Sequence, residues 1–589
     1  MLRACIAVCA VIAMVASPIG CHRSGSEHQG GVPLQVAEQS KEPSDGPRAA
    51  PAGFRGELGG PDSRVAQSMP VPPMSGSLSI RGKARAASPG LPAPQAEGYN
   101  RDAYDHSPES AFQDVLAHPR STFSIDVDTA SYSNIRRFIS DGMLPPAGAV
   151  RVEELVNYFD YKYPVPADEH PFSVSLDAAT CPWNDSHQLV RIGLASQPVP
   201  MDRRPPCNLV FLLDVSGSMQ SADKLGFVKS AMQMLTRQLN GDDQVAMVVY
   251  AGASGLVLPS TSADDQKLIL EAIDRLAAGG STNGGAGIRL AYQVAREHFV
   301  ENGINRVILC TDGDFNVGTT SQSELVDLIE TGARSGVFLS VFGFGRGNLN
   351  DSTMEKLADK GNGVYGYVDT LNEARRLMVD QVGATLITVA RDVKIQVDFN
   401  PRHITAWRLV GYENRTLATE DFDDDRKDAG EIGAGHRVTA FYEVVPAGAE
   451  SPARTAAPSR FVHPVTATAA DSDVMLAVDL RYKLPDGDTS RKFTRQLNRD
   501  ELVEFADTAG DFRFAAAVAA YGMILRQSEF AGQATLEWVR ETAAASKGPD
   551  KQGIRNEFVQ MVATTHALFG EQRSGPSSIA GPARNQASR

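Results

Sequence analysis

The chain has 589 residues, which is too long for one hydrophobic core and predicts about three to four domains. It has 57 Lys and Arg against 71 Asp and Glu, so its formal net charge is −14. An acidic chain without a basic cluster argues against binding to the phosphate backbone of nucleic acid. Its 11 His lack zinc-ligand spacing, and there is no Cys-x-x-Cys, which argues against a zinc site.

Residues 1–21 have the features of an export signal. Arg3 supplies the positive start, and the apolar stretch that follows is too short to span a bilayer. The stretch ends in Ser-Pro-Ile-Gly-Cys, which resembles a bacterial lipoprotein box with Cys21 as the acylated residue. Pro18 stands where Leu is usual, so simple secretion stays open as the alternative. His22 in place of Asp resembles lipoproteins of the outer membrane, and we expect a lipid anchor on its periplasmic face or at the cell surface.

Residues 22–105 are rich in Gly, Pro, Ser and Ala and show no sustained apolar period. This composition predicts a disordered spacer that holds a folded body away from a membrane. A disordered tail is predicted for 571–589.

Three cysteines remain after the signal and Cys21 are set aside, namely Cys181, Cys207 and Cys310. Because the number is odd, at least one thiol stays unpaired within the chain. A disulfide between Cys181 and Cys207 is compatible with an oxidising envelope compartment and stays open.

Three folded segments follow in chain order. Residues 106–205 mix strand-like and helical periods and predict an α+β domain. Residues 206–383 alternate continuous apolar strands with amphipathic helices, which predicts an α/β domain with a doubly wound, mostly parallel sheet. Residues 384–570 begin with alternating, antiparallel-type strands and continue with helices at about 499–526, 533–544 and 552–569.

Five oxygen-bearing side chains follow strands of the predicted α/β domain. Asp214, Ser216 and Ser218 form an Asp-x-Ser-x-Ser loop after the apolar run 209–213, Thr282 lies in a Gly-rich loop, and Asp312 follows the run 307–310. Ligands of doubly wound sheets bind outside the carboxyl ends of the strands. Hydroxyl and carboxylate oxygens suit Mg²⁺, with Ca²⁺ or Mn²⁺ as alternatives. Helix capping by the same residues is the simpler explanation, but it does not account for all five together.

The segment 206–383 resembles the von Willebrand factor type A (VWA) domain with its metal-ion-dependent adhesion site. The layout of about 110–570 resembles a bacterial family that joins an N-terminal VWA-associated domain, a VWA domain and an uncharacterised C-terminal domain. The resemblance rests on the strings at 123–134, 309–318, 411–415 and 428–436. It implies a Rossmann-like VWA fold in which the five residues bind the metal and a partner protein donates a carboxylate to it.

We therefore expect a cell-envelope lipoprotein that binds a protein and is not an enzyme. Its oligomeric state stays open. A structural protein whose metal only stabilises the fold is one alternative. A metal-assisted hydrolase is another, although no general base or nucleophile is recognisable. Because the ligands lie in loops, we expect Asp214→Ala, Ser216→Ala and Asp312→Ala to remove binding more than folding.

Overall fold

The computed structural model describes residues 104, 107–125, 128–200, 203–252, 254–280, 284–313, 322–346, 349–381, 386–427, 429–453, 472–485 and 487–574. All of these residues belong to one compact unit that spans 94–589. Cys21 and the predicted signal peptide lie outside the described residues, as does the predicted spacer except residue 104. The predicted tail is described only at 571–574, where it is helical rather than disordered.

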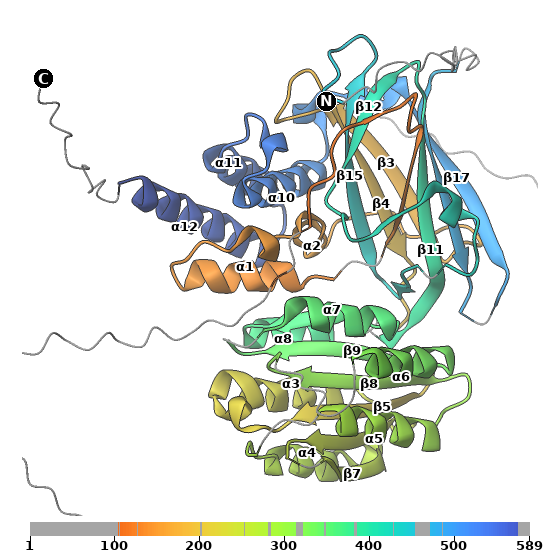
Figure 1. Cartoon of the computed structure of the whole chain (residues 1–589), viewed down its shortest axis with the longest axis vertical. Helices are drawn as coiled ribbons and strands as arrows, with labels where there is room; N and C mark the ends of the chain where they lie inside the picture. The colour runs from red at the N-terminus through yellow and green to blue at the C-terminus, as the bar shows by residue number, and fades with distance from the viewer. Residues whose placement is uncertain are drawn as a thin grey trace, which may run out of the picture. The chain divides into compact units, whose positions relative to one another are not determined.

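The middle of the chain forms a six-stranded sheet with the order β10-β9-β8-β5-β6-β7 (Figure 1). Neighbouring strands are parallel, except that β7 runs antiparallel to β6. The predicted doubly wound α/β fold is confirmed. The strands are β5 (Cys207–Asp214), β6 (Gln244–Tyr250), β7 (Ser254–Ser262), β8 (Ile304–Thr311), β9 (Val337–Phe344) and β10 (Tyr365–Val368).

Helices cover both faces of this central sheet, which is why β5 is buried along its whole length and continuously apolar from Leu209 to Leu213. One face packs against α3, α4 and α8, and the other packs against α5, α6 and α7. The helices are α3 (Phe227–Thr236), α4 (Gln266–Arg275), α5 (Gly284–Glu297), α6 (Gln322–Arg334), α7 (Asp351–Lys360) and α8 (Leu371–Arg375). Short helical turns add η2 (Gly217–Gln220), η3 (Ala222–Gly226), η4 (Ala263–Asp265) and η5 (Arg376–Asp380).

The segments before and after the central domain share two further sheets. One has the order β1-β12-β15-β4-β3-β18, and the other has the order β13-β2-β11-β16-β17, with β14 paired to β11. The first flank supplies β1 (Gln113–Asp114), β2 (Arg120–Ser124), β3 (Phe172–Thr180) and β4 (Gln188–Ser196). The second flank supplies β11 (Thr388–Phe399), β12 (Ile404–Val410), β13 (Thr416–Leu417), β14 (Ile432–Gly433), β15 (Arg437–Pro446), β16 (Val474–Lys483), β17 (Ser490–Asn498) and β18 (Leu502–Val503).

The two shared sheets enclose one apolar core. Phe123 of β2 and Ile192 of β4 pack in it together with Leu409 of β12 and Val478 of β16. Since β2 pairs with β11 and β4 pairs with β15, neither flank completes its sheets alone. The segments predicted as an N-terminal and a C-terminal domain therefore form a single body with the central domain between them in sequence.

Helices from both flanks form a second core beside the shared sheets. They are α1 (Ala130–Ser140), α2 (Val152–Asn157), α10 (Gly510–Arg526), α11 (Leu536–Ser546) and α12 (Ile554–Ser574). The helix predicted from about 499 begins only at Gly510, because Leu502 and Val503 pair with β3 as a short strand. Further single turns are η1 (Ala147–Ala149), η6 (Thr419–Phe422), η7 (Arg499–Glu501), η8 (Phe505–Asp507) and η9 (Glu529–Ala531). Within the described ranges, every helix is too short or too polar to cross a membrane.

Candidate metal centre

The loop after β5 gathers polar groups at the carboxyl end of that strand. Asp214 is buried, and its Oδ1 accepts a hydrogen bond of 2.9 Å from the backbone N–H of Ser216. The hydroxyl of Ser216 lies 3.0 Å from the hydroxyl of Ser218. Ser216 is buried whereas Ser218 is exposed. The structure thus brings these three predicted ligands together, with the outermost hydroxyl at the surface.

The neighbouring strands add groups to the same edge of the sheet. The hydroxyls of Thr311, at the end of β8, and Tyr250, at the end of β6, each donate a hydrogen bond of 3.3 Å to Oδ2 of Asp214. Asp312 follows β8 directly and is buried. Because β5 and β8 are parallel neighbours, Asp312 arrives beside Asp214.

Burial and repulsion by Asp312 make the ionised form of Asp214 costly without a bound metal ion. Burial raises the pKa of Asp214, hydrogen bonds from Ser216 lower it, and the charge of Asp312 raises it again. A bound metal ion would offset that repulsion and favour the ionised form of Asp214.

A lysine that the sequence analysis missed is part of this centre. The Nζ of Lys224, on η3, donates a hydrogen bond of 2.8 Å to Oδ2 of Asp312, and the two side chains are 9% and 0% exposed. The aliphatic stem of Lys224 packs over Gly345, where an added Cβ would lie 2.2 Å from its Cγ. Gly345 also has a φ of +77°, so this close approach requires glycine. The signal available in the sequence was that Lys224 is the first basic residue after the serine loop.

The Gly-rich loop that carries Thr282 reaches the serine loop through its backbone. The N–H of Gly279 donates a 2.7 Å hydrogen bond to the carbonyl of Val215, and the N–H of Gly217 donates a 3.0 Å bond to the carbonyl of Gly280. Thr282 itself lies outside the described residues. Its role as a ligand therefore stays a prediction.

The donor set fits a hard divalent cation. Two hydroxyls at 3.0 Å from each other and two buried carboxylates converge on one edge of the sheet. Among the described residues, no three His, Cys, Asp or Glu side chains gather as a metal-binding group. Serine hydroxyls would thus occupy coordination positions that carboxylates occupy in many other metal sites.

Family models match most of the chain. A model described as von Willebrand factor type A domain matches residues 208–380, and one described as von Willebrand factor matches 98–191. A model described as uncharacterized protein YfbK, C-terminal, matches 384–568. The uncharacterized protein YfbK of Escherichia coli strain K12 is 41% identical over 473 residues, which cover 78% of this chain and 80% of that protein. The chain belongs to the YfbK family.

Other similarities of this YfbK family member are confined to parts of the chain. Bovine inter-alpha-trypsin inhibitor heavy chain H3 is 28% identical over 171 residues, which cover 27% of this chain and 18% of that protein. A solved structure, von Willebrand factor type A from Catenulispora acidiphila, covers 67% of this chain and 89% of that chain at 17% identity, with a TM-score of 0.38. VWA domains generally bind a divalent metal at their adhesion site and typically mediate metal-dependent interactions between proteins.

The three cysteines of the folded body are separate, buried thiols. The disulfide that the sequence left open between Cys181 and Cys207 is therefore not formed. Burial raises the pKa of the Cys207 thiol to about 12, so this thiol is not a nucleophile at neutral pH.

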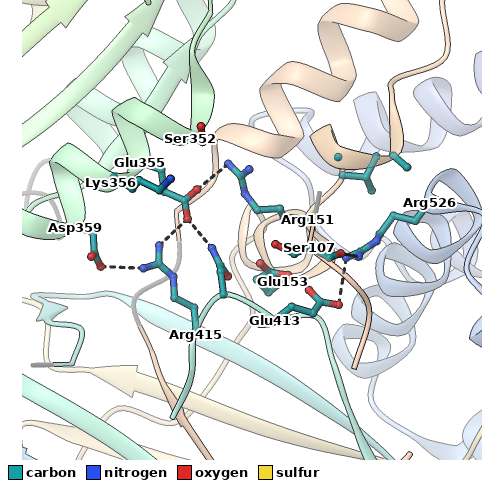
Figure 2. A pocket seen from close by; sticks show the side chains of 14 residues that line it. Ser107, Arg151, Glu153, Ser352, Glu355, Lys356, Asp359, Glu413, Arg415 and Arg526 are labelled. Atoms are coloured by element: carbon teal, nitrogen blue, oxygen red, sulfur yellow. Dashed lines mark hydrogen bonds and ion pairs between the residues drawn. The ribbon is translucent and has the colours of Figure 1, made fainter. Parts of the chain in front are cut away.

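A cavity of about 320 Å³ lies among the N-terminal flank, α7 and the segment before β13 (Figure 2). Its arginines are paired with acids: Arg151 with Asp351 at 2.6 Å, Arg415 with Asp359 at 2.9 Å, and Arg526 with Glu413 at 3.2 Å. Glu153 also lines this cavity and forms no ion pair with any described residue. Burial, and then the charge of Glu413, raises the pKa of Glu153 to about 7.

Proposed function

We propose that this protein captures a protein partner by presenting it with a divalent cation, Mg²⁺ in the first instance. The observation that carries the proposal is the convergence of the Ser216 and Ser218 hydroxyls with Asp214 and Asp312 at one edge of the VWA sheet. Thr282, in the adjoining loop, is the fifth ligand of the proposal. The cation would offer an open coordination position to a carboxylate of the partner.

The charges of this chain support the capture of an acidic group. Asp214 and Asp312 carry two negative charges, and Lys224 returns one positive charge at hydrogen-bond distance. A divalent cation then leaves the centre with a net positive charge, which attracts a carboxylate. Ser218 is exposed, so the partner approaches from its side of the centre.

The test is cation binding and partner capture by the full chain and its variants. We expect calorimetry to show Mg²⁺ binding that Asp214→Ala, Ser216→Ala and Asp312→Ala remove. Mg²⁺-dependent, chelator-sensitive capture of a protein from envelope extract should be lost in the same variants. Asp223→Ala, one residue before Lys224 and outside the donor set, is the control and should behave as the wild type.

Three results would lead to a different function. Retention of Mg²⁺-dependent capture by all three variants would refute the adhesion site. A metal that raises the melting temperature without any metal-dependent capture would favour a structural role. Turnover of phosphoester or peptide libraries only with Mg²⁺ would favour a hydrolase.

We further propose that Cys21 anchors the protein to a membrane of the cell envelope through lipid, with residues 22–105 as the spacer. Support comes from the apolar leader that ends in Gly-Cys and from the composition of the spacer. Cys21→Ser should move the protein from the detergent-soluble membrane fraction to the soluble envelope fraction. A mature N-terminus at a residue other than 21 would contradict the anchor.

A further inference from the structure

A second, larger cavity lies at the amino ends of the central strands, whereas Asp214 and Asp312 lie at their carboxyl ends. Its volume is about 920 Å³, within the range of small-molecule sites. The central domain contributes Arg306 and residues 362–364, 376–377 and 379–381. The flanks contribute residues 433–437 and the segment between α11 and α12.

Arg306 is a buried cation that forms no ion pair with a carboxylate of any described residue. It lies near the start of β8 and is 2% exposed. Its Nη1 donates a hydrogen bond of 2.7 Å to Oγ of Ser340, and its Nε has no hydrogen-bond partner among the residues that the structure describes. The guanidinium carbon lies 5.6 Å from the ring centroid of Phe338. Within the part of the chain that the structure describes, Arg306 forms no ion pair, although the charge of Glu431 acts on it from farther away.

Arginines elsewhere in the molecule show how this chain usually neutralises buried guanidinium groups. In the smaller cavity, Arg151, Arg415 and Arg526 each contact a carboxylate (Figure 2). In the larger cavity itself, Arg376 pairs with Glu373 at 2.6 Å. Burying a guanidinium without a paired anion costs free energy. An anion that binds to Arg306 from outside the chain would reduce this cost.

The surroundings of Arg306 limit the charge and the size of that anion. The cavity lining has equal numbers of acids (Asp128, Asp160, Asp380, Glu431, Asp511 and Asp550) and of Lys and Arg residues (Lys162, Arg306, Arg376, Arg437, Lys551 and Arg555). A lining without net charge suits one negative charge better than the two of a phosphate group. Apolar side chains from three segments, Val199, Leu377 and Ile554, also face the cavity.

Arg306 keeps its charge at neutral pH. Burial lowers its pKa from 12.5 to about 10, and Glu431 acts in the opposite direction. A planar guanidinium pairs with a carboxylate through two parallel hydrogen bonds.

We propose that this cavity binds a small organic acid whose single carboxylate pairs with Arg306 and whose apolar body contacts Val199, Leu377 and Ile554. The inference does not depend on the metal centre, because none of these residues belongs to it.

The experiment uses sodium octanoate as the probe and the full chain with chelator present, so that the carboxylate has no bound metal to occupy. We expect saturable binding by calorimetry and a rise in melting temperature with octanoate concentration. Heptan-1-ol and heptylamine have the same seven-carbon chain without the negative charge, and we expect much weaker effects from them.

Variants of Arg306 separate the proposed site from general binding of an apolar acid. Arg306→Met should weaken octanoate binding by about tenfold or more, and Arg306→Lys by less, because lysine keeps the charge but loses the paired geometry. Arg334→Met is the control; it removes an exposed arginine of α6 and should bind octanoate as the wild type does.

Two outcomes would overturn the proposal. One is the absence of saturable octanoate binding to the wild-type chain in the millimolar range. The other is equal binding by the wild type and the Arg306 variants. If Arg306→Met does not fold, Arg306→Lys against the wild type decides, because lysine retains the charge at the same place.

Discussion

The two ends of β8 carry buried charges that are treated in opposite ways. At the carboxyl end, Asp312 is 1% exposed and lies 2.8 Å from Nζ of Lys224, a residue of the same domain. Near the amino end, Arg306 is 2% exposed and has no ion pair with a described residue. One strand thus has at one end an acid that is paired with a lysine, and at the other end an arginine that contacts no carboxylate of the described residues.

The difference distinguishes buried charges that stabilise the fold from buried charges that can bind a ligand. Where a buried pair is complete, removing one member leaves the other charge buried and unpaired. Where a buried charge has no partner in the chain, its removal costs the fold little, and only ligand binding should change. Variants of paired and unpaired groups can test this distinction.

The largest effect is expected for the paired acid. Asp312→Ala leaves the Lys224 ammonium buried without its carboxylate, which should lower the free energy of unfolding by about 3 to 5 kcal/mol. This revises the expectation from sequence that ligand variants leave folding intact, because the lysine contact was not foreseen. Urea unfolding without metal measures the effect.

The double variant Asp312→Ala/Lys224→Met provides the control. It removes both charges and should recover most of the lost stability. A single variant as stable as the wild type would contradict the structural role of the pair.

A smaller effect is expected for Glu153, an unpaired buried acid. Its pKa in the folded protein is about 7, above the ordinary value of 4.5. The folded state therefore holds this proton more tightly than the unfolded state, so stability is full below about pH 4.5 and falls as the pH rises to about 7. From pH 4.5 to pH 8 the loss assigned to this group should be roughly 2 to 3 kcal/mol.

Unfolding at several pH values checks this prediction. Glu153→Gln should remove only the part of the decline that Glu153 contributes, because burial also raises the pKa of Glu154 to about 7 and Glu154 still titrates in the variant. Glu271→Gln, at an exposed position on α4, should leave the profile unchanged. An identical pH profile for Glu153→Gln and the wild type would show that Glu153 does not titrate in this range.

Lys224→Met tests how the lysine affects metal binding at the carboxyl end of β8. The ammonium competes with a divalent cation for Asp312, so its loss should strengthen Mg²⁺ binding by about tenfold, or about 1.4 kcal/mol. Because the centre then has less positive charge, capture of an acidic partner should not improve to the same degree. Calorimetry of Mg²⁺ measures the first effect, and weaker Mg²⁺ binding by the variant would show that Lys224 supports the metal.

The smallest effect on stability is expected for Arg306→Met. Methionine removes an unpaired buried charge and loses one hydrogen bond to Ser340, so the free energy of unfolding should change by less than about 1 kcal/mol. Urea unfolding of the ligand-free chain checks this. A loss as large as that of Asp312→Ala would show that Arg306 is structural and that the two ends of β8 are alike.

The metal centre could be predicted from the sequence where its residues directly follow strands. Asp214, Ser216 and Ser218 lie within five consecutive residues, and a parallel sheet brings Asp312 to the same edge by topology alone. Lys224 was not foreseen because its place depends on a helical turn and on space above Gly345. Hydrophobic periods do not contain such tertiary information.

Long-range contacts also limited what could be predicted for the two flanks. Alternating patterns predicted strands on both sides of the central domain, and the structure has them. Which strands pair is decided by long-range contacts such as β2 with β11, so the sequence suggested two flanking domains where there is one body. The cavity around Arg306 was missed for the same reason, because several separate segments build it.

The shared sheets also determine the order in which the chain can fold during synthesis. Arg120 of β2 contacts Asp398 of β11, which is 278 residues away. At about 5 to 20 residues per second, a ribosome needs on the order of tens of seconds to make the missing partner strand. The central domain is complete earlier, since its last strand, β10, precedes β11. The first flank therefore waits with open strand edges beside a domain that has already folded, and it is the part of the nascent chain most in need of a chaperone.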